Sequence, residues 1–158
     1  MADNTTKDLR KAFGNFATGI TVITSTDPKG KPQGMTVNSF STVSLDPPLI
    51  SWCIGREATL FELFQQTEHF AVNILSSDQK PISELFASSS VDKFSKHSWL
   101  SGFKSLPLLD NCACQLLCSV EHKYAGGDHV IVVGRVIQTN SNGNSPLIYH
   151  GGKYKELK

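Results

Sequence analysis

The sequence predicts a mainly β domain with antiparallel strands and two or three short helices. Seven or eight runs rich in Val, Ile, Thr, Phe and Trp alternate with turn residues. No internal repeat and no linker divides the 158 residues, so one domain over residues 1–158 is expected. A closed barrel is the natural way for so many antiparallel strands to hide their edges.

The composition argues against several classes of partner. The sequence contains fifteen Lys and Arg and fourteen Asp and Glu, with no long run of either charge. No nucleic-acid partner is therefore expected. No apolar run approaches the ~20 residues that span a bilayer, and the polar N-terminus lacks the apolar region of a secretion signal. We therefore expect no membrane association and a cytoplasmic location.

The first element expected is a helix over residues 6–16. Leu9, Phe13 and Phe16 share one face at helical spacing, and residues 4–6 supply side chains that cap its start. The strands that follow are rich in β-branched and aromatic residues and are bounded by turn signals: residues 20–26, two runs within 34–54 separated by a turn at 44–48, 69–75, 112–122, 129–139, and a last hairpin within 146–157.

Two further helices are expected, one after residue 59 and one over residues 79–86. Thr59 and Glu62 match a capping box, and residues 76–78 cap the second helix. The helix start at Thr59 also offers free N–H groups to a phosphate. Two interpretations of this helix start remain: a helix capped by its own side chains, and a binding site for a phosphate. Residues 87–109 read as a long connection.

Residues 34–54 organise the chain. The first run in this stretch carries small polar side chains that leave its backbone open to a flat heterocycle: Thr36, Asn38, Ser39, Ser41 and Thr42. An ordinary half-exposed strand with Ser and Thr on its solvent-exposed face explains the same pattern.

The four cysteines are expected to be core residues. Cys112, Cys114 and Cys118 share one strand face with Leu116, and with Cys53 they form no C-x-x-C pair. No metal site is therefore expected, and free thiols fit a reducing compartment. Dinucleotide-fold, Walker, zinc-protease and nucleophile-elbow motifs are absent from the sequence, so motifs alone identify no enzyme class.

Six ordered segments resemble the flavin reductase-like family, the reductase components of two-component flavin monooxygenases. They span nearly the whole chain: FATGITVIT (16–24), GMTVNSFSTVSLDPPLISWCI (34–54), FAVNILSSDQ (70–79), DKF (92–94), GGDHVIVVGRV (126–136) and PLIYHGGKY (146–154). The resemblance implies an FMN-binding split barrel that forms a homodimer. It also implies binding of FMN or FAD, hydride transfer from NADH or NADPH, and delivery of reduced flavin to a monooxygenase component.

The resemblance also implies which residues contact the flavin. One strand lines the ring with Met35, Thr36, Val37, Asn38 and Ser39, and the next strand covers its other side with Ser51, Trp52 and Cys53. A following turn holds the phosphate with Ala58 and Thr59. Further residues reach the phosphate or adenosine end: Gln79, Lys93 and Phe94. The sequence departs from the family pattern at Glu57 and Ala58, where small hydroxyl residues are usual, and at Lys93, where arginine is expected.

His129, in the run Gly127-Asp128-His129, is assigned by resemblance to the nicotinamide or its phosphate, with Tyr154 as a companion. A histidine that only caps a turn explains the same run. The family fold also contains FMN-binding electron-transfer or storage proteins, which gives a non-enzymatic alternative. A relative of pyridoxamine-phosphate oxidase would need basic residues for a substrate phosphate, and no such cluster is evident.

Overall fold

The structure is a computed structural model that describes residues 5–89 and 92–157. Seven strands form one antiparallel sheet in the order β3-β2-β6-β9-β10-β5-β4. Their bounds are β2 Thr21–Thr26, β3 Pro32–Val37, β4 Ser41–Leu45, β5 Pro48–Gly55, β6 His69–Ile74, β9 Cys114–Gly126 and β10 His129–Ser141. The predicted mainly β, antiparallel class is confirmed.

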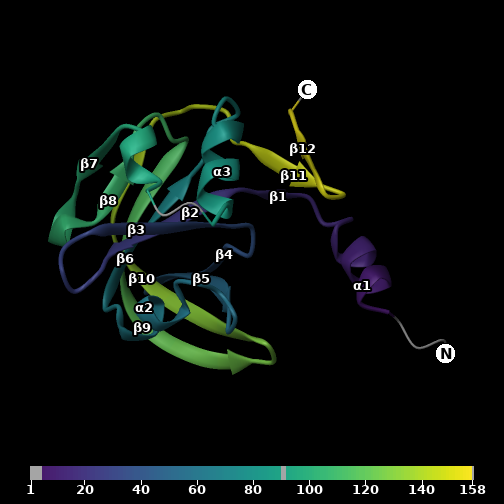
Figure 1. Ribbon diagram of the computed structural model, residues 1–158, viewed down its shortest axis with the longest axis horizontal. Coiled ribbons are helices and arrows are strands. Elements are labelled where there is room, and N and C mark those ends of the chain that lie inside the picture. Colours follow the sequence, from purple (N-terminus) through teal and green to yellow (C-terminus); the bar gives the residue numbers. More distant parts are fainter. Residues whose placement is uncertain (1–4, 90–91, 158) are drawn as a thin grey trace.

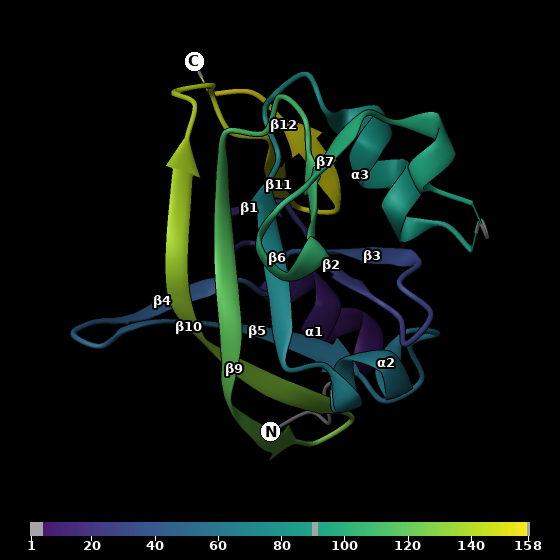
Figure 2. The same cartoon turned by 90° about the vertical axis from the view of Figure 1, so that its left-hand side faces the viewer.

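The sheet curls into a split barrel because its two edge strands are consecutive in sequence. β3 and β4 lie at opposite ends of the strand order and are joined by residues 38–40 alone. In this link the Ser39 hydroxyl accepts a hydrogen bond from the Cys53 backbone N–H on β5 (2.9 Å) and donates to the Cys53 carbonyl (3.3 Å), which extends the pairing of β4 with β5. Figure 2 shows the β4–β5 hairpin projecting away from the barrel wall formed by β9, β10 and β6.

In the described residues, smaller elements surround this sheet, except α1, which stands apart from it (Figure 1). They comprise two more sheets, three helices and two 3₁₀ turns: β1 Thr18–Gly19 with β11 Ile148–His150 and β12 Lys153–Lys155; β7 Trp99–Ser101 with β8 Pro107–Leu109; α1 Thr6–Phe13, α2 Phe61–Gln66 and α3 Lys80–Ala87; η1 Phe94–Lys96 and η2 Phe103–Ser105. No helix in the described part of the chain has both the length and the apolar content to cross a membrane.

The barrel core is built on Trp52. Its ring makes edge contacts with Phe64 (centroids 5.0 Å apart) and Phe70 (5.7 Å apart), and all three side chains are almost fully buried. A second cluster, with Phe86 and Leu75 at its centre, lies between the sheet and α3. β6 is buried along most of its length, as the apolar run at 69–75 predicts.

The N-terminal helix α1 forms where the sequence predicts it but buries none of its residues. Thr5 and Asp8 form a reciprocal capping box that fixes its start, and the helix ends at Phe13 rather than at residue 16. Phe13 is 72% exposed and Phe16 is 79% exposed. Figure 1 shows α1 standing apart from the barrel.

Three local predictions are wrong. The polar run after Gly34 is one strand in the prediction but breaks at residues 38–40 into β3 and β4. The capping box at Thr59 does not form, because backbone bonds from Ala58 N–H to Gly55 O and from Phe61 N–H to Ala58 O make a turn through Thr59. α2 therefore begins at Phe61, with no side-chain cap. Residues 87–109 contain the β7–β8 hairpin rather than only loops and turns.

The prediction that the cysteines are core residues is confirmed for two of the four, and Cys112 precedes β9 instead of sharing a strand face with Cys114 and Cys118. Cys112 and Cys118 are fully buried, and burial raises the pKa of each thiol to about 12. Cys53 and Cys114 are half-buried, and burial raises the pKa of both. All four are free thiols.

Candidate functional site

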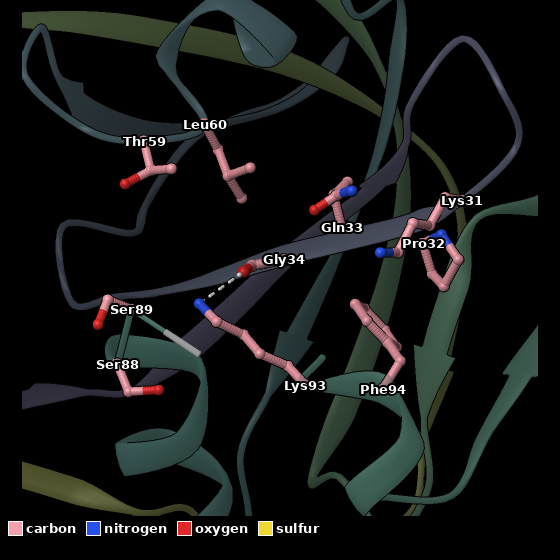
Figure 3. Close-up of a pocket in the computed structure, with 10 residues that line it drawn as sticks. All are labelled: Lys31, Pro32, Gln33, Gly34, Thr59, Leu60, Ser88, Ser89, Lys93 and Phe94. Carbon is pink, nitrogen blue, oxygen red and sulfur yellow. Dashed lines mark hydrogen bonds between the residues drawn. The ribbon is translucent and has the colours of Figure 1, made fainter. Parts of the chain in front are cut away.

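A groove runs along the exposed side of β3 and consists of two adjoining cavities. Both cavities are lined by Thr59, Leu60, Ser88 and Lys93, which form their junction. The inner cavity, of about 250 Å³, is completed by Met35, Thr36, Glu57, Ala58, Phe86 and Ala87. The outer cavity, of about 200 Å³, is completed by Lys31, Pro32, Gln33, Gly34, Ser89 and Phe94. Figure 3 shows the outer cavity, with Thr59 and Leu60 on one side of β3 and residues 88–89 and 93–94 on the other.

The floor of the groove is fixed by contacts between β3 and α3. The Thr36 hydroxyl donates to the Ser83 carbonyl at 2.7 Å. Gly34 lets the Phe86 ring approach, since a Cβ at this position would lie 2.9 Å from Phe86 Cε1. These contacts hold the helix against an edge strand that has only one strand neighbour, and they leave the groove side of β3 uncovered.

Lys93 places a positive charge at the junction of the two cavities. Its ammonium group donates to the Phe86 carbonyl at 2.9 Å and to the Gly34 carbonyl at 3.4 Å, a bond drawn in Figure 3. Burial lowers the pKa of this amine. Within residues 5–89 and 92–157 no carboxylate pairs with it. The geometry thus leaves a half-buried cation facing the groove, where an anionic ligand group can neutralise it.

The β9–β10 turn is attached to the segment that leads into the groove. The Arg56 N–H donates to the Asp128 carbonyl at 2.9 Å, and Arg56 Nε donates to the Gly127 carbonyl at 3.2 Å. His129 lies beside Gly55, the residue opposite it on β5. His129 Nδ1 is 2.8 Å from Asp128 Oδ1, and this bond holds the pKa of Asp128 below its usual value. The His129 side chain is 48% exposed, so it is available to a ligand.

The structure brings six of the predicted flavin contacts together in the groove: Met35, Thr36, Ala58, Thr59, Lys93 and Phe94. The Thr59 hydroxyl is not used as a helix cap. Thr59 therefore joins Lys93 in the wall at the junction, an arrangement that suits a phosphate.

A second group of predicted residues lies at the barrel gap. Asn38 and Ser39 are exposed in the link between β3 and β4, and Ser51 and Cys53 are half-buried on β5. The Ser39 hydroxyl bonds to the Cys53 backbone and so ties the two segments together. These residues line neither cavity. They lie beyond the β3 end that carries Met35 and Thr36.

Four predicted residues have side chains that serve the fold in this chain. Val37 and Trp52 are buried in the core, so only their backbones remain for a ligand. Gln79 accepts from the Ser76 N–H at 3.0 Å and donates to the Asp110 carbonyl at 2.7 Å. The Tyr154 hydroxyl lies 2.9 Å from Ser83 Oγ on α3, in a different part of the fold from the His129 turn.

Several groove residues are absent from the sequence prediction. Lys31 ends the turn between β2 and β3, Pro32 and Gln33 begin β3, and Leu60 precedes α2. Nothing in their local pattern marks them. Their role depends on the register of β3 and on residues 88–89 and 93–94, which line the same cavity.

Comparisons with known proteins agree with this architecture. The family described as flavin reductase like domain matches residues 13–158. A probable flavin reductase from Rhizobium meliloti is 42% identical over 146 residues, which are 92% of this chain and 47% of that protein. The reductase component of a flavin-dependent trigonelline monooxygenase from Acinetobacter baylyi is 39% identical over 153 residues, which are 97% of this chain and 49% of that protein. The chain thus spans about half the length of these two curated relatives.

A solved structure gives the same result for the fold. The Streptomyces globisporus NADH:FAD oxidoreductase, in complex with NAD and FAD fragments, superposes with a TM-score of 0.91 at 36% identity. The match covers 96% of this chain and 92% of that one. With the split barrel and the open groove along β3, these matches establish that the chain belongs to the flavin reductase like domain family.

Proposed function

We propose that this protein is an NAD(P)H:flavin oxidoreductase that takes FMN or FAD as its hydride acceptor. The observation that carries the proposal is the groove along β3, which has a cation at its centre and the His129 turn attached near its inner end. The relatives named as flavin reductases support the same activity.

The residues present fit a flavin. Lys93 and Thr59 face a phosphate at the junction, and the small polar residues of the β3–β4 link leave backbone groups open to a ring. When bound, the flavin accepts a hydride, that is two electrons and one proton, from the nicotinamide, and a second proton comes from solvent. Glu57, in the inner cavity, is the one group there that disfavours a phosphate.

In this proposal the role of the protein is to position the flavin and the nicotinamide next to each other. Lys93 and Thr59 hold the phosphate, and the backbone at Asn38 and Ser39 orients the ring. His129, held by Asp128, orients the nicotinamide beside Gly55. Such positioning provides the near-attack geometry on which hydride transfer depends.

Purified protein mixed with NADH and free FMN or FAD tests the proposal. We expect the absorbance of the reduced nicotinamide to fall over many turnovers, and only when flavin is added. Flavin binding without NADH consumption would instead favour the non-enzymatic alternative, an FMN-binding electron-transfer or storage protein.

We also propose that the chain works as a homodimer, because none of the described residues covers two of its apolar surfaces. One comprises Leu9 and Phe13 of α1 with Phe16, which follows the helix. The other is an open cavity of about 600 Å³ between the β4–β5 hairpin and the barrel, whose apolar lining comprises Phe40, Val43, Leu45, Leu49, Ile50, Ile74, Leu116 and Val136. Exposed apolar surfaces of this kind mark contacts between proteins, and a second copy is the occupant that we propose.

We propose, finally, that reduced flavin passes to a monooxygenase component in the cytoplasm. The relative named as a monooxygenase reductase component supports such a partner. The four free thiols fit a reducing compartment.

A further inference from the structure

We infer that Lys123, on β9, is a positioning residue for the flavin. Its ammonium group fastens α2 in the orientation that keeps Thr59 and Leu60 in the wall of the groove. The inference rests on the proposed function, because the flavin is the ligand that this wall would contact. Lys123 itself lines neither cavity, so it acts on the ligand only through α2.

The helix α2 has few means of its own to hold its position. It is six residues long, and it follows Leu60 without a side-chain cap. At its other end, the last carbonyl groups of a helix have no partner within the helix. An isolated helix of this length is unstable in water. The position of α2 therefore has to be set by contacts with the rest of the fold.

Lys123 provides such a contact at the C-terminal end of α2. Its Nζ donates to the Gln65 carbonyl at 2.6 Å and to the Thr67 carbonyl at 3.3 Å. A cation at this end of a helix also interacts favourably with the helix dipole. Among the described residues, no carboxylate lies within ion-pair distance of this ammonium group. The half-buried charge of Lys123 is therefore directed at the end of the helix.

A row of side chains on the sheet holds α2 at a second point. Val132 on β10 pairs with Lys123 on one side and with Trp52 on the other, so the three side chains lie on one face of the sheet. The Trp52 ring contacts Phe64 of α2, with centroids 5.0 Å apart, and both rings are almost fully buried. The aromatic contact fixes how deep the helix lies, and the two bonds from Lys123 fix how it is rotated.

The orientation of α2 is passed directly to the groove wall. The Phe64 N–H donates to the Leu60 carbonyl at 3.1 Å. This bond joins the first turn of α2 to the residues that precede it, of which Thr59 and Leu60 line both cavities. A rotation of the helix therefore displaces Thr59 and Leu60 relative to Lys93, which lies at the same junction.

The β9–β10 hairpin thus holds the segment between β5 and β6 at both ends. Near the start of this segment, the Arg56 N–H donates to the Asp128 carbonyl in the turn of the hairpin. Near its end, Lys123 holds the two carbonyls of the helix terminus. Because the two attachments are separate, loss of Lys123 should disturb the wall that faces the flavin and leave the turn that leads to His129 in place.

The test compares Lys123→Met with Lys123→Arg in the full chain. Methionine has a side chain of similar length without the charge, whereas the guanidinium group of arginine can donate to both carbonyls. A titration with FMN, followed by flavin fluorescence and without NADH, gives the Kd. We expect Lys123→Met to raise the FMN Kd about fivefold, and Lys123→Arg to restore it to within about twofold of the unaltered protein. An equal increase in both variants would overturn the inference.

Two further readouts separate positioning from a general effect on stability. Leu117→Ala lowers stability in a different cluster, formed with Ala71 and Leu106, and should leave the FMN Kd unchanged. In Lys123→Met, kcat at saturating FMN and the KM for NADH should also be unchanged, because Arg56 still holds the His129 turn. An FMN Kd raised equally by Leu117→Ala, or an effect of Lys123→Met on the KM for NADH alone, would overturn the inference.

Hydrogen exchange of the unaltered protein gives a test that needs no variant to fold. Coupling between two sites is reciprocal, so a flavin held by the groove wall should stabilise α2 in return. FMN should therefore slow amide exchange at Phe64 and Thr67, whose N–H groups donate to the Leu60 and Leu63 carbonyls. Exchange that FMN leaves unchanged at both positions would overturn the inference.

Lys153→Met is the matched control for the substitution, since Lys153 is exposed on β12 and lines neither cavity. It should not change the FMN Kd. The inference and the proposed activity fail separately. FMN binding that depends on Lys123, without any NADH oxidation, would refute the reductase and leave the role of Lys123 intact. NADH oxidation with an unchanged FMN Kd in Lys123→Met would do the reverse.

Discussion

At the scale of single residues, His129 is the side chain best placed to meet the hydride donor. We expect His129→Ala to raise the KM for NADH about fivefold to tenfold, the loss of one hydrogen bond worth ~1–1.4 kcal/mol, while the flavin Kd changes less than twofold. Steady-state kinetics at saturating flavin measure this effect. His122→Ala, an exposed histidine stacked near Tyr124 on β9, is the control and should behave as the unaltered protein. An unchanged KM in His129→Ala would count against the assignment.

Lys93 makes the flavin affinity depend on pH, and the structure fixes the direction of this dependence. Burial lowers the pKa of this amine, and an amine binds an anion only in its protonated form. Flavin affinity should therefore fall as pH rises through that lowered pKa, starting below the ~10.4 of a free lysine. The flavin phosphate does not change its charge in this range, because its second pKa is ~6.

The pH effect is measured as the FMN Kd at increasing alkaline pH. In Lys93→Arg the guanidinium remains charged, so the alkaline loss should disappear even if the Kd at neutral pH differs. The same loss in both proteins would show that another group is responsible. Lys29→Arg, in the exposed hairpin, should retain the unaltered profile.

At the scale of elements, β10 can cross the barrel core only because residue 134 has no side chain. A Cβ on Gly134 would lie 2.5 Å from Cζ of Phe70 and 3.3 Å from Cβ of Cys118, and neither side chain has room to move in the core. Gly134→Ala should therefore lower the free energy of unfolding by about 1–3 kcal/mol. Gly19→Ala is the control, since nothing lies within 4 Å of its Cβ position. Urea unfolding compares the two, and equal midpoints would refute the packing argument.

Elements set by local pattern are predicted well from this sequence. The start of α1 follows from the capping side chains expected at residues 4–6, of which Thr5 is the cap, and the long hairpin of β9 and β10 follows from two alternating runs around Gly126 and Gly127. The break at residues 38–40 is not visible in the sequence, because it arises when a curling sheet brings its two edges together. Likewise, Thr59 and Glu62 have the spacing of a cap but lie in a turn that backbone bonds to Gly55 and Ala58 impose.

The candidate site is predictable only in part, for the same physical reason. Residues on β3 and at 58–59 and 93–94 are identified by resemblance, and the structure gathers most of them in one groove. The attachment of Arg56 to the His129 turn and the outer wall at Lys31 and Gln33 depend on pairings between distant parts of the chain. A single sequence contains no local signal for such contacts.

At the scale of the whole molecule, the exposed face of α1 predicts association. An isolated helix of eight residues is marginal in water, so this helix needs a partner surface to be stable. The double variant Phe13→Ser, Phe16→Ser should shift the protein from dimer to monomer at micromolar concentration in light scattering. It should also lower the melting temperature, because the second copy stabilises only the folded state.

Leu100→Ser is the control for association, since Leu100 is 66% exposed on β7, which Figure 1 places on the opposite side of the molecule from α1. It should remain a dimer. A monomeric unaltered protein, or a double variant with unchanged mass, would refute the proposed role of α1.

The incomplete closure of the barrel also affects how a ligand enters and leaves the site. Among the described residues, β3 and β4 form no ladder with each other, and the link between them is tied to β5 by the side chain of Ser39. A ligand in the groove along β3 can therefore enter and leave while the ladders between paired strands stay intact. Rapid exchange of the ligand is therefore compatible with a β-sheet that stays fully folded.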